Sequence, residues 1–163
     1  MVQGKAGRAV QLISIVALLA FSVSADENAG GETYVSWGLF EPDKCATVWL
    51  IKRHIDPNAR FAFVERDAEL PEGIAFDTPG AKFRRYHNRC TYETFLEHHQ
   101  LSDERLVYIG RIMHDIEVNV WERKALADTA RVEAEILEIL SDDDPEGNVD
   151  ACLAYFDALY LSL

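Results

Sequence analysis

One stretch decides the fold: EPDKCATVWLIKRHIDP at residues 41–57, followed after two residues by RFAFVE at residues 60–65. Pro42 suits the first position of a helix, where its missing N–H is not needed. Apolar residues recur at helical spacing through residues 48–55, so we expect one helix whose apolar side, with Trp49, packs against a sheet. The Asp-Pro pair keeps the residue before the proline out of the helical region and should end the helix. The apolar segment after it predicts a strand.

The rest of the chain predicts a small sheet followed by helices. Residues 34–37 alternate in polarity, which favours a first strand ahead of the helix. Strand, helix and strand in this order predict a parallel pair, and residues 72–77 predict a third strand. Further helices are expected at residues 91–99, 102–117, 125–140 and 149–161. We therefore predict an α+β fold, formed by a single domain at residues 26–163, in which a small, partly parallel sheet with a βαβ start packs on a mainly helical C-terminal half.

The first 25 residues have the pattern of an export signal. Lys5 and Arg8 precede an apolar run at residues 9–23, and small residues before Asp26 form a cleavage site of the Ala-x-Ala type. The apolar run, of about fifteen residues, is short for a membrane span. We expect residues 1–25 to be a signal peptide cleaved after Ala25, with an uncleaved anchor as the alternative. The mature protein would then be periplasmic or secreted, with no stable membrane insertion.

The chain is acidic. It carries 16 Lys and Arg against 28 Asp and Glu, which gives a formal net charge of −12 at pH 7. Nucleic-acid binding needs dense Lys and Arg, so this composition argues against a nucleic-acid partner. Solubility alone is a sufficient explanation for the acidic surface.

Three cysteines, Cys45, Cys90 and Cys152, allow one disulfide in an oxidising compartment and leave one thiol over. Cys45–Cys90 is the expected pair because both residues lie in the N-terminal half of the chain. The alternative is three buried thiols that pack as small apolar side chains.

Cations are concentrated in two segments. Residues 82–89 (KFRRYHNR) hold four cations, one additional His and no acid, and the helix at residues 41–56 adds Lys52, Arg53 and His54. Guanidinium groups present a planar fork suited to oxyanions. If the two segments converge, they form an anion site in an acidic molecule. The alternative is internal pairing with the surplus Asp and Glu.

Two acidic segments contain types of residue that bind metals. His114 is followed by Asp115, and a His beside a carboxylate can ligate a metal or act as a general base. Adjacent helical residues point about 100° apart, so His114 shares a face with Glu117 instead, unless the helix ends there. Residues 142–153 have the early acids of a calcium loop, but Leu153 stands where a bidentate Glu is required. The alternatives are the polar flank of a core helix and an acidic turn that opens the last helix.

Several motifs resemble one protein family. The segment DKCATVWLIKRHIDP is similar to the opening motif of the chromate resistance exported protein family, whose domain also forms the C-terminal part of a chromate-responsive regulator. Four shorter segments resemble the same family: AFDTPG at 75–80, RCTYE at 89–93, IMHDIE at 112–117 and FDALY at 156–160. Many relatives have Cys-Pro-Trp where this chain has Thr47, Val48 and Trp49, so a cysteine function at that point does not transfer. The resemblance implies a role in chromate resistance and supplies no set of catalytic residues.

We therefore expect an exported protein of the chromate resistance family that binds a small inorganic anion or a metal ion in a pocket roofed by the helix at residues 41–56. The expected anion contacts are Lys44, Arg53 and Arg89. His114 and Asp115 are the expected residues for a divalent metal ion or for proton chemistry. The alternatives are a metal-assisted redox enzyme acting on chromate and a non-catalytic interaction partner of a transport system.

Overall fold

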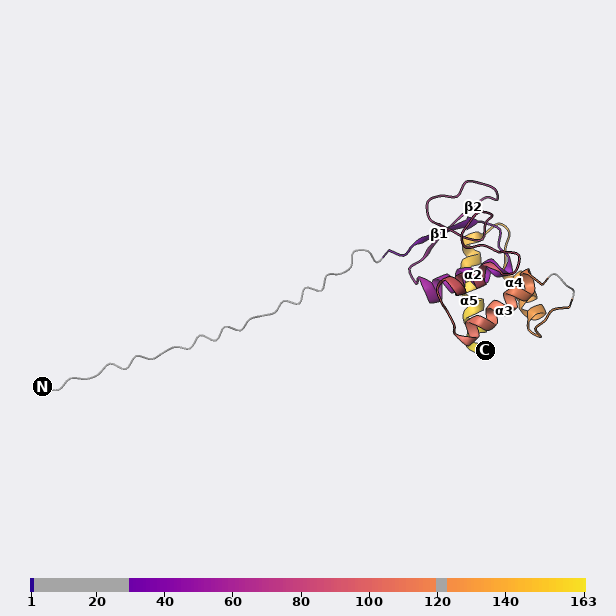
Figure 1. Cartoon of the computed structure of the whole chain (residues 1–163). Helices are drawn as coiled ribbons and strands as arrows, with labels where there is room; N and C mark the ends of the chain where they lie inside the picture. The colour runs from indigo at the N-terminus through magenta and orange to yellow at the C-terminus, as the bar shows by residue number, and fades with distance from the viewer. Residues whose placement is uncertain (2–29, 120–122) are drawn as a thin grey trace.

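The computed structural model of the chain describes residues 1, 30–119 and 123–163. The expected signal peptide, apart from Met1, lies outside the described residues. The elements follow in this order (Figure 1): β1 (Thr33–Trp37), α1 (Pro42–Leu50), the π-helix η1 (Ile51–Ile55), β2 (Arg60–Val64), β3 (Ile74–Ala75), α2 (Thr91–His98), α3 (Glu104–Glu117), α4 (Thr129–Ile139) and α5 (Pro145–Ser162). No helix within these described ranges combines the length and the apolar composition that a membrane span needs.

The three strands form one parallel sheet in the order β2-β1-β3. β1 pairs with β2 from Thr33 opposite Arg60 to Trp37 opposite Val64, and its other edge pairs with β3. Gly73 lets β3 approach β1 closely, because a Cβ at this position would lie 2.6 Å from the carbonyl oxygen of Thr33. The predicted βαβ start and the α+β class are both confirmed.

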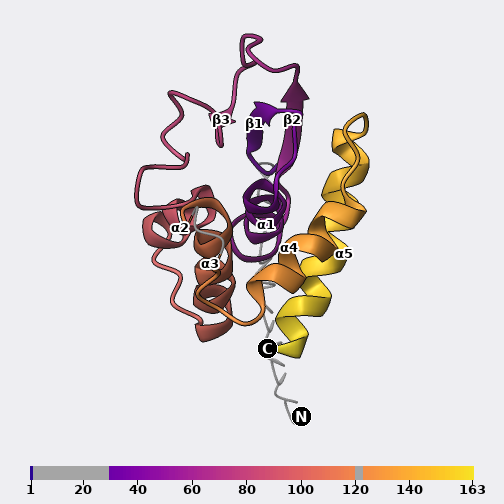
Figure 2. The ribbon, with the colours of Figure 1, turned by 90° about the vertical axis from the view of Figure 1, so that its right-hand side faces the viewer.

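α1 is the centre of the molecule. All nine of its residues are buried, and it contacts α2, α3, α4 and α5. Figure 2 shows α1 nearly end-on beneath the sheet, with α2 and α3 on one side and α4 and α5 on the other. Burial of a helix on all sides removes apolar area from water, so α1 contributes to the hydrophobic stabilisation of the fold.

Trp49 of α1 is 1% exposed, so its predicted burial is confirmed. Its ring packs against Phe156 and Tyr160 of α5, and its Nε1–H donates to Asp157 at 2.8 Å. The aromatic rings around Trp49 therefore belong to the last helix and to His54 of η1, and not to the sheet as expected.

The central helix changes geometry before it ends. It continues from α1 into the π-helix Ile51–Ile55, where the N–H of Asp56 bonds the carbonyl five residues earlier at 2.8 Å. The helix stops before Pro57, as predicted, but the apolar spacing did not indicate the wider turn. Arg53 in this turn bonds Asp157 of α5. The wider turn thus occurs where the central helix contacts the distant helix α5. A local sequence pattern carries no information about such a contact, so it could not predict the turn.

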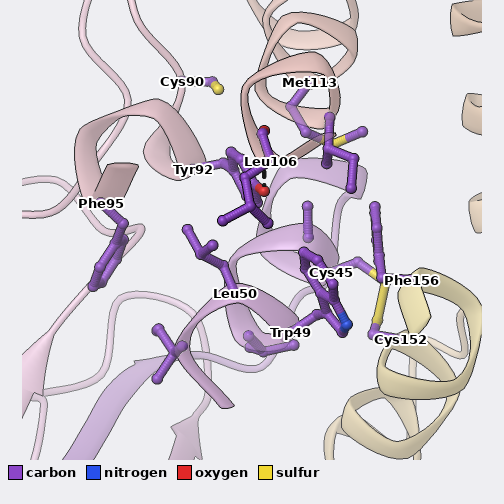
Figure 3. Close-up of a cluster of buried hydrophobic side chains, with 14 of the residues drawn as sticks. Cys45, Trp49, Leu50, Cys90, Tyr92, Phe95, Leu106, Met113, Cys152 and Phe156 are labelled. Atoms are coloured by element: carbon purple, nitrogen blue, oxygen red, sulfur yellow. Dashed lines mark hydrogen bonds between the residues drawn. A yellow bond between two sulfur atoms is a disulfide. The ribbon is translucent and has the colours of Figure 1, made fainter. Parts of the chain in front are cut away.

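The disulfide joins Cys45 and Cys152, with sulfur atoms 1.99 Å apart, and links α1 to α5 (Figure 3). The expected Cys45–Cys90 pair is therefore wrong. Cys90 is a buried free thiol at the start of α2, and Figure 3 shows it away from the disulfide. Position along the chain misled the prediction because the packing of α1 on α5 brings together cysteines that are 107 positions apart.

Candidate functional site

A cavity of about 440 Å³ lies where the chain leaves the carboxyl ends of β1 and β3. The chain passes from β1 to β2 on one side, while β3 lies on the other side of β1. This arrangement is a topological switch point, the place where open parallel sheets commonly bind ligands. We call it the switch-point cavity, and its charged lining residues are Glu41, Asp43, Lys44, Arg66, Asp77, Arg84, Arg85 and Glu117.

Lys44, an expected anion contact, does line the switch-point cavity. Its Nζ donates to the carbonyl oxygens of Trp37 at 2.8 Å and Leu39 at 2.6 Å, and lies 3.4 Å from a carboxylate oxygen of Asp77. Burial lowers the pKa of Lys44, while the Asp77 carboxylate opposes this shift. The ammonium group therefore ties the β1–α1 loop to the loop after β3 and contributes positive charge to the cavity wall.

Asp43 fixes the wall of the cavity next to Lys44. Its two carboxylate oxygens accept from the backbone N–H of Thr91 at 2.6 Å and of Tyr92 at 2.9 Å, at the start of α2. Burial and the nearby Asp77 raise the pKa of Asp43, and the two backbone hydrogen bonds act in the opposite direction. The hydroxyl of Thr91 also donates to Asp77 at 2.7 Å. α1, α2 and the loop after β3 are thereby locked together around the cavity.

Two neighbouring arginines, Arg84 and Arg85, contribute positive charge to the cavity. Arg84 donates to the carbonyl of Ala81 at 2.7 Å, and its guanidinium lies 4.4 Å from the centre of the Tyr86 ring. Arg85 donates to Oε2 of Glu117, the last residue of α3, at 2.8 Å. The Arg85 side chain is 54% exposed, so its guanidinium can reach both the cavity and solvent.

The other two expected anion contacts lie elsewhere. Arg53 makes two hydrogen bonds to Asp157, of 3.0 and 2.9 Å, and the pKa of Asp157 is lowered chiefly by this partner. Arg89 forms an ion pair with Glu97 and lines a second cavity of about 420 Å³. The expected convergence of Arg53 with residues 82–89 is not observed among the described contacts. The cationic segment instead divides between the two cavities.

The bonds of Arg53 also join two segments that resemble the chromate resistance family. Asp157, in the FDALY segment, accepts from both Arg53 and Trp49 of the opening segment. These motifs therefore form one structural contact between the central helix, with its π-turn, and α5.

His114 and Asp115 point to different partners. Nδ1 of His114 lies 2.8 Å from Oε2 of Glu93, which also accepts from the backbone N–H of Cys90. Asp115 is 3% exposed, and its carboxylate is held by residues beyond the end of α3, with donors from Asn119, Ala125, Leu126 and Thr129. The two side chains do not converge on one another in the described structure. In the described ranges no group of three or more His, Cys, Asp or Glu is arranged to hold a metal ion.

The hydrogen bonds to Asp115 give it a structural role. Its pKa is held well below the usual range because the hydroxyl of Thr129, two backbone N–H groups and the amide of Asn119 stabilise the charged form, in spite of desolvation. Asp115 therefore fastens the end of α3 to the start of α4.

The acidic turn before α5 opens a helix. Asp144 is the N-cap of α5 and accepts from the N–H of Gly147 at 2.9 Å, with Pro145 at the first helical position. This arrangement agrees with the helix-start interpretation of the segment.

The sequence prediction missed two important residues of the switch-point cavity. Asp77 pairs with Lys44, and Glu117 was considered only as a neighbour of His114 on the same helix face. Asp77 lies at the end of the predicted third strand. Loops at the carboxyl ends of parallel strands commonly carry ligand sites, so this position could have indicated Asp77 as a site residue. No local signal pairs Arg85 with Glu117, because the two residues are 32 positions apart.

The fold and the cavity define a class: an α+β domain with a candidate ligand site at the carboxyl ends of a small parallel sheet. The chain matches the family described as "ChrB, C-terminal domain" over residues 34–163, and it belongs to that family. The resemblance to the chromate resistance family is thereby confirmed. No solved structure matches the chain.

One curated relative is Protein ChrB of Cupriavidus metallidurans, which is 33% identical to this chain over 78 residues. The aligned segment is 47% of this chain and 24% of that relative. This chain therefore matches about a quarter of the length of the relative.

Proposed function

We propose that this protein is exported and contributes to chromate resistance by binding a small oxyanion in the switch-point cavity. The observation that carries the proposal is the meeting of Lys44, Arg84 and Arg85 at one cavity at the carboxyl ends of β1 and β3, in a chain with a net charge of −12. Family membership supports chromate as the relevant anion.

The charges of the cavity bound the affinity. A hydrogen bond between an arginine and an anion is worth about 1.5–3 kcal/mol. Two or three such bonds, reduced by the entropy lost on association, correspond to a dissociation constant of about micromolar or weaker. Chromate and sulfate share tetrahedral shape and charge, so both anions should bind with similar affinity.

Calorimetric titration of chromate and of sulfate into the purified protein tests this proposal. Arg84→Ala and Arg85→Ala should each weaken binding about tenfold or more, because each removes one charge-assisted bond. Arg53→Ala and Arg89→Ala are matched controls that remove a paired arginine outside the cavity. Loss of binding in a control with retention in the cavity variants would move the site to the residue changed. No heat with either anion would refute the proposal.

Two further measurements address the alternatives. Elemental analysis of the purified protein tests for a divalent metal, the ligand that the sequence alone suggests for His114 and Asp115. Absorption of chromate during incubation with the protein and an added reduced nicotinamide, compared with the reductant alone, tests for redox chemistry, since a binding protein does not speed the loss of the chromate absorption. Turnover of chromate would favour the redox enzyme over the binding protein.

Export is supported by the pattern of residues 1–25 and by the Cys45–Cys152 disulfide, since such bonds persist in oxidising compartments. Mass spectrometry of the periplasmic fraction should find Asp26 at the N-terminus. Intact protein beginning at Met1 in a membrane fraction would contradict cleavage.

A further inference from the structure

The switch-point cavity already contains an anion that belongs to the protein. Glu117 reaches the cavity from the end of α3, and its Oε2 accepts a hydrogen bond of 2.8 Å from Arg85. The Glu117 side chain is only 10% exposed, whereas that of Arg85 is 54% exposed. The buried partner of this pair is thus the carboxylate, and it lies where the anion of the proposed function would contact Arg85.

The surroundings of Glu117 do not favour a charged carboxylate. Burial raises the pKa of Glu117, and the carboxylates of Glu41 and Asp77 add to this effect. Arg85 and the backbone N–H of Asp43, at the start of α1, act in the opposite direction. Several carboxylates share one cavity with the arginines, so part of its positive charge is neutralised from within.

We infer that Glu117 is an internal ligand of the switch-point cavity, which an external oxyanion replaces at Arg85. This inference rests on the proposed function, because it assumes that the cavity binds an oxyanion. The class of ligand is a small oxyanion that can accept hydrogen bonds from a guanidinium, as the Glu117 carboxylate does. Glu117 then sets the affinity: the external anion must compete for Arg85, and weak anions are excluded.

Glu117→Gln tests the competition, because it keeps the size of the side chain and removes its charge. Sulfate should bind this variant about tenfold more tightly than the wild type, the equivalent of freeing one charge-assisted bond. Glu97→Gln is the matched control, since it removes one negative charge that is paired with an arginine, Arg89, outside the switch-point cavity. Its affinity for sulfate should equal that of the wild type. The double variant Arg85→Ala, Glu117→Gln should not show the increased affinity for sulfate that is expected of Glu117→Gln alone.

A second variant keeps the inference testable if Glu117→Gln does not fold. Glu117→Asp keeps the negative charge but shortens the side chain by one methylene, so its carboxylate should hold Arg85 less closely than the 2.8 Å contact of Glu117. Sulfate should therefore bind Glu117→Asp more tightly than the wild type and less tightly than Glu117→Gln.

The outcomes separate this inference from the proposed function. Binding of sulfate by the wild type, with equal or weaker binding by folded Glu117→Gln, would overturn the inference and leave the proposed function standing. An equal gain in Glu97→Gln would attribute the effect to net charge and also overturn it. Failure of both the wild type and Glu117→Gln to bind sulfate or chromate would overturn both proposals. If Glu117→Gln does not fold, equal affinities of the wild type and of folded Glu117→Asp for sulfate overturn the inference.

Discussion

Reduction of the Cys45–Cys152 disulfide should remove a large part of the stability of the protein. The bond joins residues 107 positions apart, and the chain-entropy account gives a loop of that length about 4.7 kcal/mol. A folded domain has in total only about 5–15 kcal/mol. In a chain of this size the loss corresponds to a fall of about 10–20 °C in melting temperature.

Urea unfolding of the oxidised and the reduced protein measures this loss, with tryptophan fluorescence as the signal. Trp49 suits this purpose because it is buried against Phe156 of α5, the helix that the disulfide holds. Reduction opens the S–S bond and removes no atom from the core. The difference in unfolding free energy between the oxidised and the reduced protein therefore reports on the covalent link between α1 and α5. Cys90→Ala should respond to reduction as the wild type does. Equal midpoints before and after reduction, or three reactive thiols in the unreduced protein after unfolding, would refute the reasoning.

Three further substitutions test the architecture by urea unfolding. Trp49→Ala should lower the unfolding free energy by about 3–5 kcal/mol, as expected for a large core residue. Leu161→Ala, at a position 79% exposed, is the control and should change it by less than about 0.5 kcal/mol. Equal effects of the two substitutions would contradict the burial of Trp49. Asp115→Asn should cost about 1.5–3 kcal/mol at neutral pH, because it weakens hydrogen bonds to a charged group. The pKa of Asp115 is depressed in the folded protein, so the stabilisation by its carboxylate is present above the ordinary Asp pKa and is lost as the pH falls toward the folded-state pKa. If Asp115→Asn lowers the unfolding free energy equally at neutral and at strongly acidic pH, Asp115 is not ionised in the folded protein. Gly73→Ala should cost about 2–3 kcal/mol, more than Gly80→Ala, because a Cβ would collide with β1 at Gly73 and meet nothing within 4 Å at Gly80; the reverse order would remove the close approach of β3 to β1 as the reason for Gly73.

Local sequence patterns were sufficient to predict the elements and the parallel βαβ start. The helix from Pro42 to the residue before Pro57 could be predicted because both boundaries depend on the backbone chemistry of proline. The strand at residues 60–65 followed from its apolar composition. The helix beginning near residue 91 was also expected, but Cys90 rather than Thr91 occupies its N-cap position, and Asp43 supplies the buried side-chain acceptors. That acceptor comes from another helix, so no capping pattern near residue 91 could identify it.

The candidate site was harder to predict, because it depends on contacts between distant segments. Lys44 lines a cavity beside the central helix, but the expected cluster with Arg53 required two cationic segments to converge. Arg53 is drawn instead to Asp157, a carboxylate 104 positions away. A high density of cationic residues along a chain indicates that some negative group balances their charge. It does not identify whether that group is an acidic side chain or a ligand, or which side chain it is. Here the compensation is largely internal: Glu117 for Arg85 and Asp157 for Arg53.

The packing of the first helix on the last helix has a consequence for the timing of folding. The disulfide partner of Cys45 and the hydrogen-bond partner of Trp49 both lie in α5, which begins at Pro145. A nascent chain that lacks the final helix has the strands and α1 but no surface to cover the side of α1 that carries these residues. The core can therefore close only when nearly the whole chain is available, and until then the chain remains open to unfolding, to chaperones and to passage through a narrow channel.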